Sequence, residues 1–188
     1  MQLSSASTIA PLQKWASENI LLRSFMLVLA GSGILAASAW IEVPMIPVPM
    51  TMQSFAILLI GAFYGSRLAF ATVVAYLFEG AIGLPVFSGG AGGAHHLIGP
   101  TAGYLAAFPF AAAFVGLAVE RRWLQNIYAS FGAMIVSHAI VFAGGVAWLS
   151  YLFGMETAIT TGLTPFIIGS LVKSGLAVAV LQLSQTRK

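Results

Sequence analysis

Charged side chains are scarce in this chain, so the few that interrupt its long apolar segments carry the most chemical information. Lys173 lies about 12 Å into the last apolar segment, counting eight residues from Pro165 at a rise of about 1.5 Å per residue. Within a bilayer an ammonium group there costs at least about 2.5 kcal/mol, so it usually faces the protein interior or a ligand. Two interpretations follow: Lys173 pairs with Glu79 or with carbonyl groups at helix ends, or it provides the counter-charge for an anionic substrate.

Two other polar residues accompany Lys173. Ser170 lies one turn earlier on the same helical face, where its hydroxyl either bonds a substrate or bonds back to its own helix. Glu79 lies where an apolar segment meets a loop, so its carboxylate either stays at the membrane interface or points inward to a ligand or to Lys173. These residues form one candidate binding group.

Three histidines do not indicate a metal site. His138 lies in the middle of an apolar segment, where a neutral imidazole bonded to a neighbouring helix is the default interpretation and a ligand contact the alternative. His95 and His96 are adjacent but lack a third metal-type partner. No spacing supports a nucleophile with a base either, so we predict that the protein is not an enzyme and holds no metal or cofactor.

The composition explains why these residues stand out. Apolar residues make up 59% of the 188 positions and charged residues 7%, against roughly 45–50% and about 25% in soluble domains. Such a chain is expected to lie in the lipid bilayer. The net charge of +3 comes from scattered cations, which we interpret as topology signals rather than a nucleic-acid surface. Without cysteine there are no disulfides or thiolate metal sites.

The hydrophobic segments predict an all-α protein with six transmembrane helices. We expect a polar, interfacial segment over residues 1–22 and one transmembrane domain over residues 23–188. The predicted spans are the segment between Arg23 and Glu42, Met50–Tyr64, Leu68–Gly83, Thr101–Val119, Ile127–Phe153 and Thr164–Leu183.

The cations predict the orientation. The connections over residues 42–50, 84–100 and 154–163 contain no Lys or Arg, whereas seven of the eight cations lie on the opposite side of the predicted bundle. The positive-inside rule makes that side cytoplasmic, so we expect both termini inside the bacterial cytoplasmic membrane.

A glycine-rich stretch, Phe87-Ser-Gly-Gly-Ala-Gly-Gly93, precedes Gly99-Pro-Thr-Ala-Gly-Tyr104 on the predicted outer side. Such a backbone turns sharply and approaches a ligand closely, so the stretch is either a lid over a ligand or a flexible connector. It lacks the Gly-Lys-Ser/Thr ending of a nucleotide phosphate loop.

The first predicted helix carries a stripe of small residues, Ala30, Gly33, Ala36 and Ala37. Gly33 and Ala37 fit the small-xxx-small pattern, which lets another helix approach closely. The stripe either packs within the bundle or docks a separate membrane subunit.

Five motifs resemble one known family. They are Pro47-Val-Pro-Met-Thr-Met-Gln53, Gly83-Leu-Pro-Val-Phe-Ser-Gly-Gly90, Gly99-Pro-Thr-Ala-Gly-Tyr-Leu105, Gly145-Val-Ala-Trp-Leu149 and Pro165-Phe-Ile-Ile-Gly-Ser-Leu-Val-Lys173. Their order and spacing resemble the BioY family, the biotin-binding membrane subunits (S components) of energy-coupling factor (ECF) transporters. The resemblance runs from about Ala30 to Val180 and covers all six predicted spans.

The resemblance implies a six-helix S-component fold that binds biotin from outside and takes it up across the membrane. Lys173 aligns with the family's lysine in the sixth helix. The other implied pocket residues are Thr51, Gln53, Glu79, Phe87, Ser88, Gly89 and Gly90. We add Ser170 and Tyr104 as candidate substrate contacts, and Gly33 and Ala37 as candidates for partner docking.

The chain departs from the family pattern at one important position. The family usually has an aspartate three residues before the lysine, whereas this chain has Ser170. This difference keeps open a second specificity, for another vitamin or a biotin precursor such as dethiobiotin. Ala102 replaces a glycine, which is a milder change. The resemblance further implies either an ECF transmembrane subunit and paired ABC-type ATPases as partners, or action as a solitary transporter.

Overall fold

The structure, a computed structural model, describes residues 20–186, with side chains described as far as residue 184. Of the interfacial segment predicted over residues 1–22, all but the last three residues therefore lie outside the described part. Residues 20–22 belong to the first described helix.

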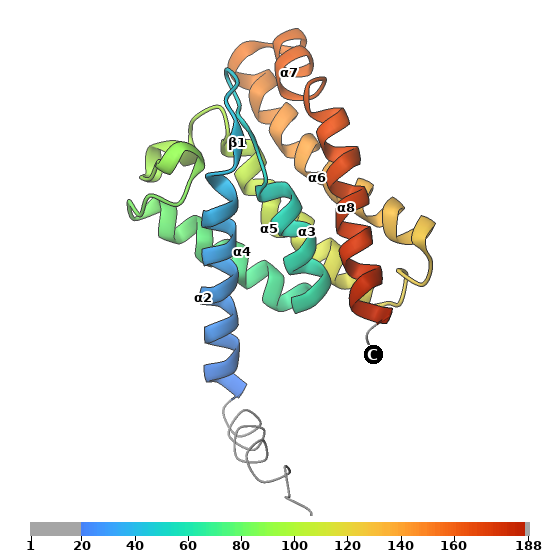
Figure 1. Ribbon diagram of the computed structural model, residues 1–188. Helices are drawn as coiled ribbons and strands as arrows, with labels where there is room; N and C mark the ends of the chain where they lie inside the picture. The colour runs from blue at the N-terminus through green and yellow to red at the C-terminus, as the bar shows by residue number, and fades with distance from the viewer. Residues whose placement is uncertain (1–19, 187–188) are drawn as a thin grey trace, which may run out of the picture.

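The described chain is a bundle of seven α-helices, shown in Figure 1. They are α2 (Ile20–Ala39), α3 (Gln53–Tyr64), α4 (Ser66–Ala81), α5 (Ala102–Glu120), α6 (Ile127–Phe153), α7 (Met155–Gly162) and α8 (Phe166–Thr186). Two short strands, β1 (Glu42–Val43) and β2 (Met50–Thr51), form an antiparallel hairpin, and two 3₁₀ turns, η1 (Ser88–Gly90) and η2 (Ala94–Leu97), lie between α4 and α5.

Four helices within residues 20–186 are long and apolar enough to cross a membrane: α2, α5, α6 and α8. Each corresponds to a predicted span, and α6 has the predicted bounds. The other two predicted spans form shorter helices than these four: α4 has the predicted length but begins two residues earlier, and α3 begins three residues later than predicted. α3 has 12 residues, about 18 Å of helix against a hydrocarbon thickness of about 30 Å, and α4 has 16. α3 is short because Met50 and Thr51 pair in the hairpin.

Two connections contain more regular structure than we predicted. Residues 154–163 were expected to be a loop, and this prediction was wrong because they contain α7. Gly154, at φ +86°, ends α6 and directly precedes α7, and Glu156 in the first turn of α7 favours its N-terminus. In residues 42–50 the ends pair as strands, while the prolines occupy the segment between them. Residues 84–100 form no continuous helix, as predicted.

α5 lies at the centre of the bundle and contacts α3, α4 and α6. Its crossing with α6 is close because both helices have glycine at the contact. A Cβ on Gly103 would collide with the carbonyl group of Gly144, and one on Gly144 with the backbone of Gly103. This close packing fixes the position of α6 relative to α5.

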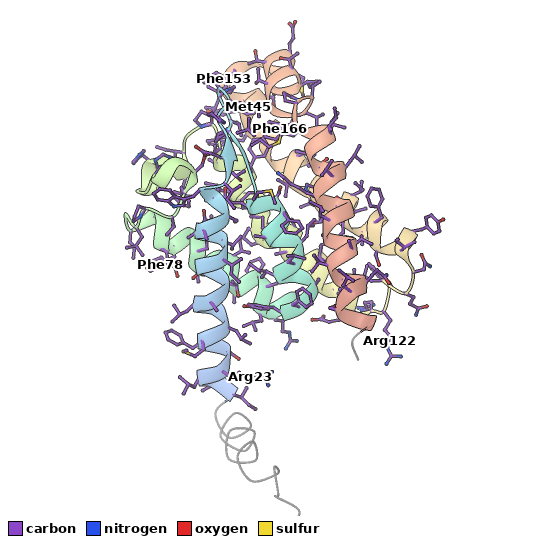
Figure 2. The ribbon with its side chains drawn as sticks, viewed as in Figure 1. Arg23, Met45, Phe78, Arg122, Phe153 and Phe166 are labelled. Carbon is purple, nitrogen blue, oxygen red and sulfur yellow. The ribbon has the colours of Figure 1, made fainter. Side chains whose placement is uncertain are left out.

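The two ends of the bundle differ in charge. Figure 2 places Arg23 and Arg122 toward one end, and Met45 and Phe153 at the other. Between the ends the helices expose large apolar side chains, such as Phe25 on α2 and Val172 on α8. An apolar outer surface of this kind fits contact with lipid.

Candidate ligand-binding site

A cavity of about 330 Å³ lies among α3, α5, α6 and α8. The segment between β1 and β2 contributes Val48 to its lining, and the α4–α5 connection contributes Phe87, Ser88 and His96. We call these two segments, residues 42–51 and 84–100, the cover. The volume falls in the range of small-molecule sites, roughly 300–1,000 Å³.

Lys173 provides a cation in the cavity wall. Its side chain is 9% exposed, and its Nζ donates hydrogen bonds to the Thr51 carbonyl oxygen at 2.6 Å and to Ser54 Oγ at 3.1 Å. Both acceptors are neutral, and an ammonium group has three N–H donors. Neither partner therefore neutralises the ammonium group of Lys173, and one of its three N–H donors is left for a ligand.

Glu79 lies elsewhere. It is half-buried, it accepts a hydrogen bond from Ser32 Oγ at 2.9 Å, and it is not among the residues that line the cavity. The ion pair with Lys173 that the sequence left open is therefore not the arrangement found. Glu79 instead joins α4 to α2.

Ser170 lines the same wall as Lys173 but bonds its own helix. Its Oγ donates to the Ile167 carbonyl oxygen at 2.7 Å. The back-bonded alternative is thus the one observed, and the oxygen lone pairs remain able to accept a hydrogen bond.

Gln53 is held by bonds at both ends of its amide. Its Oε1 accepts from Thr51 Oγ1 at 2.9 Å, and its Nε2 donates to the Tyr76 hydroxyl at 2.5 Å. Tyr76 in turn donates to the Val86 carbonyl oxygen at 2.8 Å. This chain of hydrogen bonds connects α3 and α4 to both segments of the cover, and it leaves one Gln53 N–H for a ligand.

Aromatic rings form the apolar part of the cavity. The rings of Tyr104 and Phe142 each lie 6.3 Å, centroid to centroid, from that of Phe166. The Tyr104 hydroxyl donates to the Gly162 carbonyl oxygen at 2.7 Å, at the end of α7. Tyr104 therefore presents its ring to the cavity, while its hydroxyl fixes α7 to α5.

The two segments of the cover are joined by a side-chain hydrogen bond, because Ser88 Oγ donates to the carboxylate of Glu42. His96 packs its ring 4.2 Å from that of His95 and 5.9 Å from that of Phe87. Burial, and secondarily the charge of His95, hold the pKa of His96 below its usual value. His96 is thus neutral near pH 7.

Gly89 and Gly90 shape the cover without lining the cavity. Their φ angles of +67° and +71° lie in the left-handed region, which favours glycine. A Cβ on Gly90 would also lie 3.0 Å from the Trp40 ring. Their contribution is to the path of the backbone.

The structure therefore brings together most of the predicted site residues but not all. Those that line the cavity are Thr51, Gln53, Phe87, Ser88, Tyr104, Ser170 and Lys173. Sequence reasoning missed Ser54, Phe142 and Phe166 as lining residues. Ser54 directly follows a recognised motif and Phe166 lies within one, which was the available signal. Phe142 had no signal beyond its place in an apolar helix.

The small-residue stripe on α2 faces outward at its centre. Gly33 and Ala37 are exposed, and a Cβ on Gly33 would meet nothing within 4 Å. The residues of this turn that pack into the bundle are Gly31 and Ser32. Gly33 and Ala37 therefore lie on the outer surface of the described bundle.

A cavity that is apolar except for one cation and a few anchored polar groups, inside a bundle with lipid-facing helices, defines a membrane protein that binds a small amphipathic molecule. A solved structure with the same fold is the S component for biotin from an ECF-type ABC transporter. It matches with a TM-score of 0.76 and 27% identity over 89% of this chain and 93% of that one.

The sequence comparison identifies the family. The BioY family profile matches residues 8–187, and the chain belongs to this family. Among its relatives, the biotin transporter BioY of Thermotoga maritima is 36% identical over 80% of this chain and 87% of its own length. BioY2 of Lactococcus lactis is 32% identical over 91% and 97%. A probable biotin transporter of Pyrococcus horikoshii is 34% identical over 78% and 86%.

Proposed function

We propose that this protein takes up biotin across the bacterial cytoplasmic membrane, as the substrate-capture subunit of an ECF transporter or as a solitary transporter. The observation that carries the proposal is the cavity, in which a buried, incompletely bonded Lys173 faces an apolar chamber. The relatives named biotin transporters and the biotin S component with the same fold support the choice of ligand.

Biotin's functional groups suit this lining. Its carboxylate and its urea oxygen are both acceptors that Lys173 is able to bind, and its sulfur-containing ring and aliphatic chain need apolar walls such as Phe142 and Phe166. The urea ring also needs neighbouring donors and acceptors, which Gln53 and Ser170 offer. We propose as substrate contacts Thr51, Gln53, Phe87, Ser88, Tyr104, Ser170 and Lys173. Glu79, Gly89 and Gly90 do not line the cavity; we propose that Glu79 supports the site by joining α4 to α2, and that the two glycines do so by shaping the cover.

Uptake by living cells tests this function. A biotin-requiring bacterium without its own transporter, expressing this chain, is expected to accumulate labelled biotin at nanomolar concentrations. Expression with and without the ECF module of the same host distinguishes the two modes of action. Failure in both settings, with the protein present in the membrane, contradicts the proposal.

We further propose that residues 23–188 form one domain that crosses the membrane six times, with both termini in the cytoplasm. The support is the distribution of cations, with Arg23 and Arg122 at the end opposite Met45. Because the chain has no cysteine, single substitutions report sidedness without background. Thr157→Cys on α7 is expected to react with an impermeant maleimide in intact cells, and Gln125→Cys only after lysis.

For partners, we propose that the exposed stripe at Gly33 and Ala37 receives an ECF transmembrane subunit, whose paired ATPases provide the energy. The outward position of both residues supports this docking role. Gly33→Leu is expected to reduce module-dependent uptake severalfold and leave biotin binding to the isolated protein unchanged. Ile34→Ala, at a neighbouring exposed position, is the matched control and should leave both measurements unchanged.

A biotin precursor is the second candidate ligand. Ser170 gives this cavity wall a hydroxyl bonded to its own helix, without a carboxylate. Dethiobiotin shares biotin's urea ring and carboxylate but lacks the sulfur. Competition of the two ligands for one site, measured as displacement of labelled biotin, decides which binds more tightly.

A further inference from the structure

His138 is a cavity residue whose polar atoms are only partly used. It lies on α6, its side chain is 4% exposed, and it lines the cavity. Its Nδ1 lies 3.1 Å from the Met134 carbonyl oxygen and 3.1 Å from Ser174 Oγ on α8. Its other ring nitrogen, Nε2, is buried and has no hydrogen-bond partner among the described residues.

The neighbours of Nδ1 determine which nitrogen carries the proton. A carbonyl oxygen only accepts hydrogen bonds, so the contact with Met134 requires Nδ1 to be the donor. The ring is buried and has no carboxylate among its hydrogen-bond partners, which disfavours a positive charge on it. His138 is therefore the neutral tautomer with a proton on Nδ1 and a free lone pair on Nε2.

A buried acceptor without a partner is costly, so a ligand donor is the natural complement. Near pH 7 biotin has only two such donors, the N–H groups of its urea ring, because its carboxyl group is ionised. Lys173 has no acceptor, whereas the Ser170 oxygen, which donates to its own helix, still accepts and is able to bind one of the two N–H groups. His138 lines the cavity, and no group within residues 20–184 satisfies its Nε2; because this atom is itself buried, a ligand donor reaches it when the side chains beside it move apart.

From this geometry we infer that Nε2 of His138 accepts a hydrogen bond from a urea N–H of the bound ligand and is a specificity-determining contact. This inference rests on the proposed function. Ser174 and the Met134 carbonyl group are positioning groups, since they fix the ring and its tautomer. The site thereby selects ligands with an N–H donor at this point over analogues of the same shape without one.

The test is calorimetric titration of the detergent-purified full chain with biotin and with the two biotins that carry one methyl group on either urea nitrogen. His138→Leu removes the acceptor at similar volume, whereas His138→Gln keeps an amide oxygen near the position of Nε2. Ser130→Ala is the matched control. Ser130 lies on the same helix, and its Oγ is also buried without a described partner, but it does not line the cavity.

We expect His138→Leu to bind biotin about tenfold more weakly, or about 1.4 kcal/mol, and His138→Gln to recover part of the loss. One N-methyl biotin should bind wild type weakly and lose little further affinity in His138→Leu. Ser130→Ala should bind like wild type. The thermal unfolding temperature of each variant shows whether it is folded.

Two results would overturn the inference while leaving the proposed function intact. One is folded His138→Leu that binds biotin as wild type does. The other is an equal loss for biotin and for both N-methyl biotins, which would indicate a structural effect only. If wild-type protein bound none of the ligands, the proposed function itself would fail, and this inference with it.

Discussion

The floor and the cover of the cavity are built in different ways. On the floor, formed by α3 and α8, Lys173 and Gln53 are buried and each makes two hydrogen bonds. The cover is a glycine-rich backbone with a short hairpin, joined across its two segments by the bond from Ser88 to Glu42. The difference suggests a division of work: the floor determines affinity, and the cover controls access.

The largest effect is expected at Lys173. Lys173→Ala removes a buried charge from the floor, which should weaken biotin binding by about 2 kcal/mol or more, or about 30-fold. Titration calorimetry measures the loss. Arg67→Ala, at an exposed cation outside the cavity, is the control and should bind normally. Unchanged affinity in Lys173→Ala would remove Lys173 from the site.

A smaller effect is expected at Tyr76, which supports the floor without lining the cavity. Tyr76→Phe leaves the buried Gln53 amide and the Val86 carbonyl without their shared partner. This should lower the free energy of unfolding by about 1–3 kcal/mol and reduce biotin affinity severalfold. Thermal unfolding with and without biotin separates the two effects. Tyr128→Phe, at an exposed tyrosine, should change neither.

A substitution in the cover should change the rates of biotin association and dissociation more than the affinity for biotin. Glu42→Ala removes the acceptor of the Ser88 hydroxyl and so loosens the two segments from each other. Biotin association and dissociation should both become severalfold faster, with little change in Kd. Stopped-flow displacement of a labelled biotin measures both rates. A large loss of affinity with unchanged rates of exchange would contradict the assignment of access to the cover.

The smallest expected effect concerns pH. The pKa of His96 is lowered in the folded protein, so protonation favours the unfolded or opened cover. The neutral form's contribution to stability is complete above the unfolded pKa of about 6.5 and is lost as the pH falls below it. Biotin binding should weaken slightly from pH 7 to pH 5.5, and by less in His96→Gln. An identical pH profile in the two proteins would refute a role for His96.

Much of the fold was predictable from the sequence because the signals were local. α6 begins where the Asn126 side chain accepts a hydrogen bond from the Ala129 N–H, and it ends at Gly154, which adopts a positive φ. α7 was missed because its Thr-rich, polar sequence resembles a loop in a hydropathy profile. Its packing against α6 is a tertiary interaction that hydropathy does not report.

The site was predictable only in part for the same reason. Lys173 stood out because a lone charge in an apolar helix needs a partner. Its bonds to Thr51, in β2, and to Ser54, in α3, depend on how these elements lie against α8, which no spacing along the chain encodes. Glu79 carried an equally strong signal, yet the packing of α4 against α2 gives it Ser32 instead. Residue type therefore indicated which groups were unusual, and packing determined which of them meet.

The most direct test is calorimetric titration of the purified protein with biotin, and in parallel with biotin methyl ester, at one pH near neutrality. We expect saturable biotin binding with one site per chain. A large loss for the ester would place Lys173 at the carboxylate, and similar binding of both would place it at the urea ring. Folded protein that binds neither compound would contradict the proposal that this cavity is a biotin site.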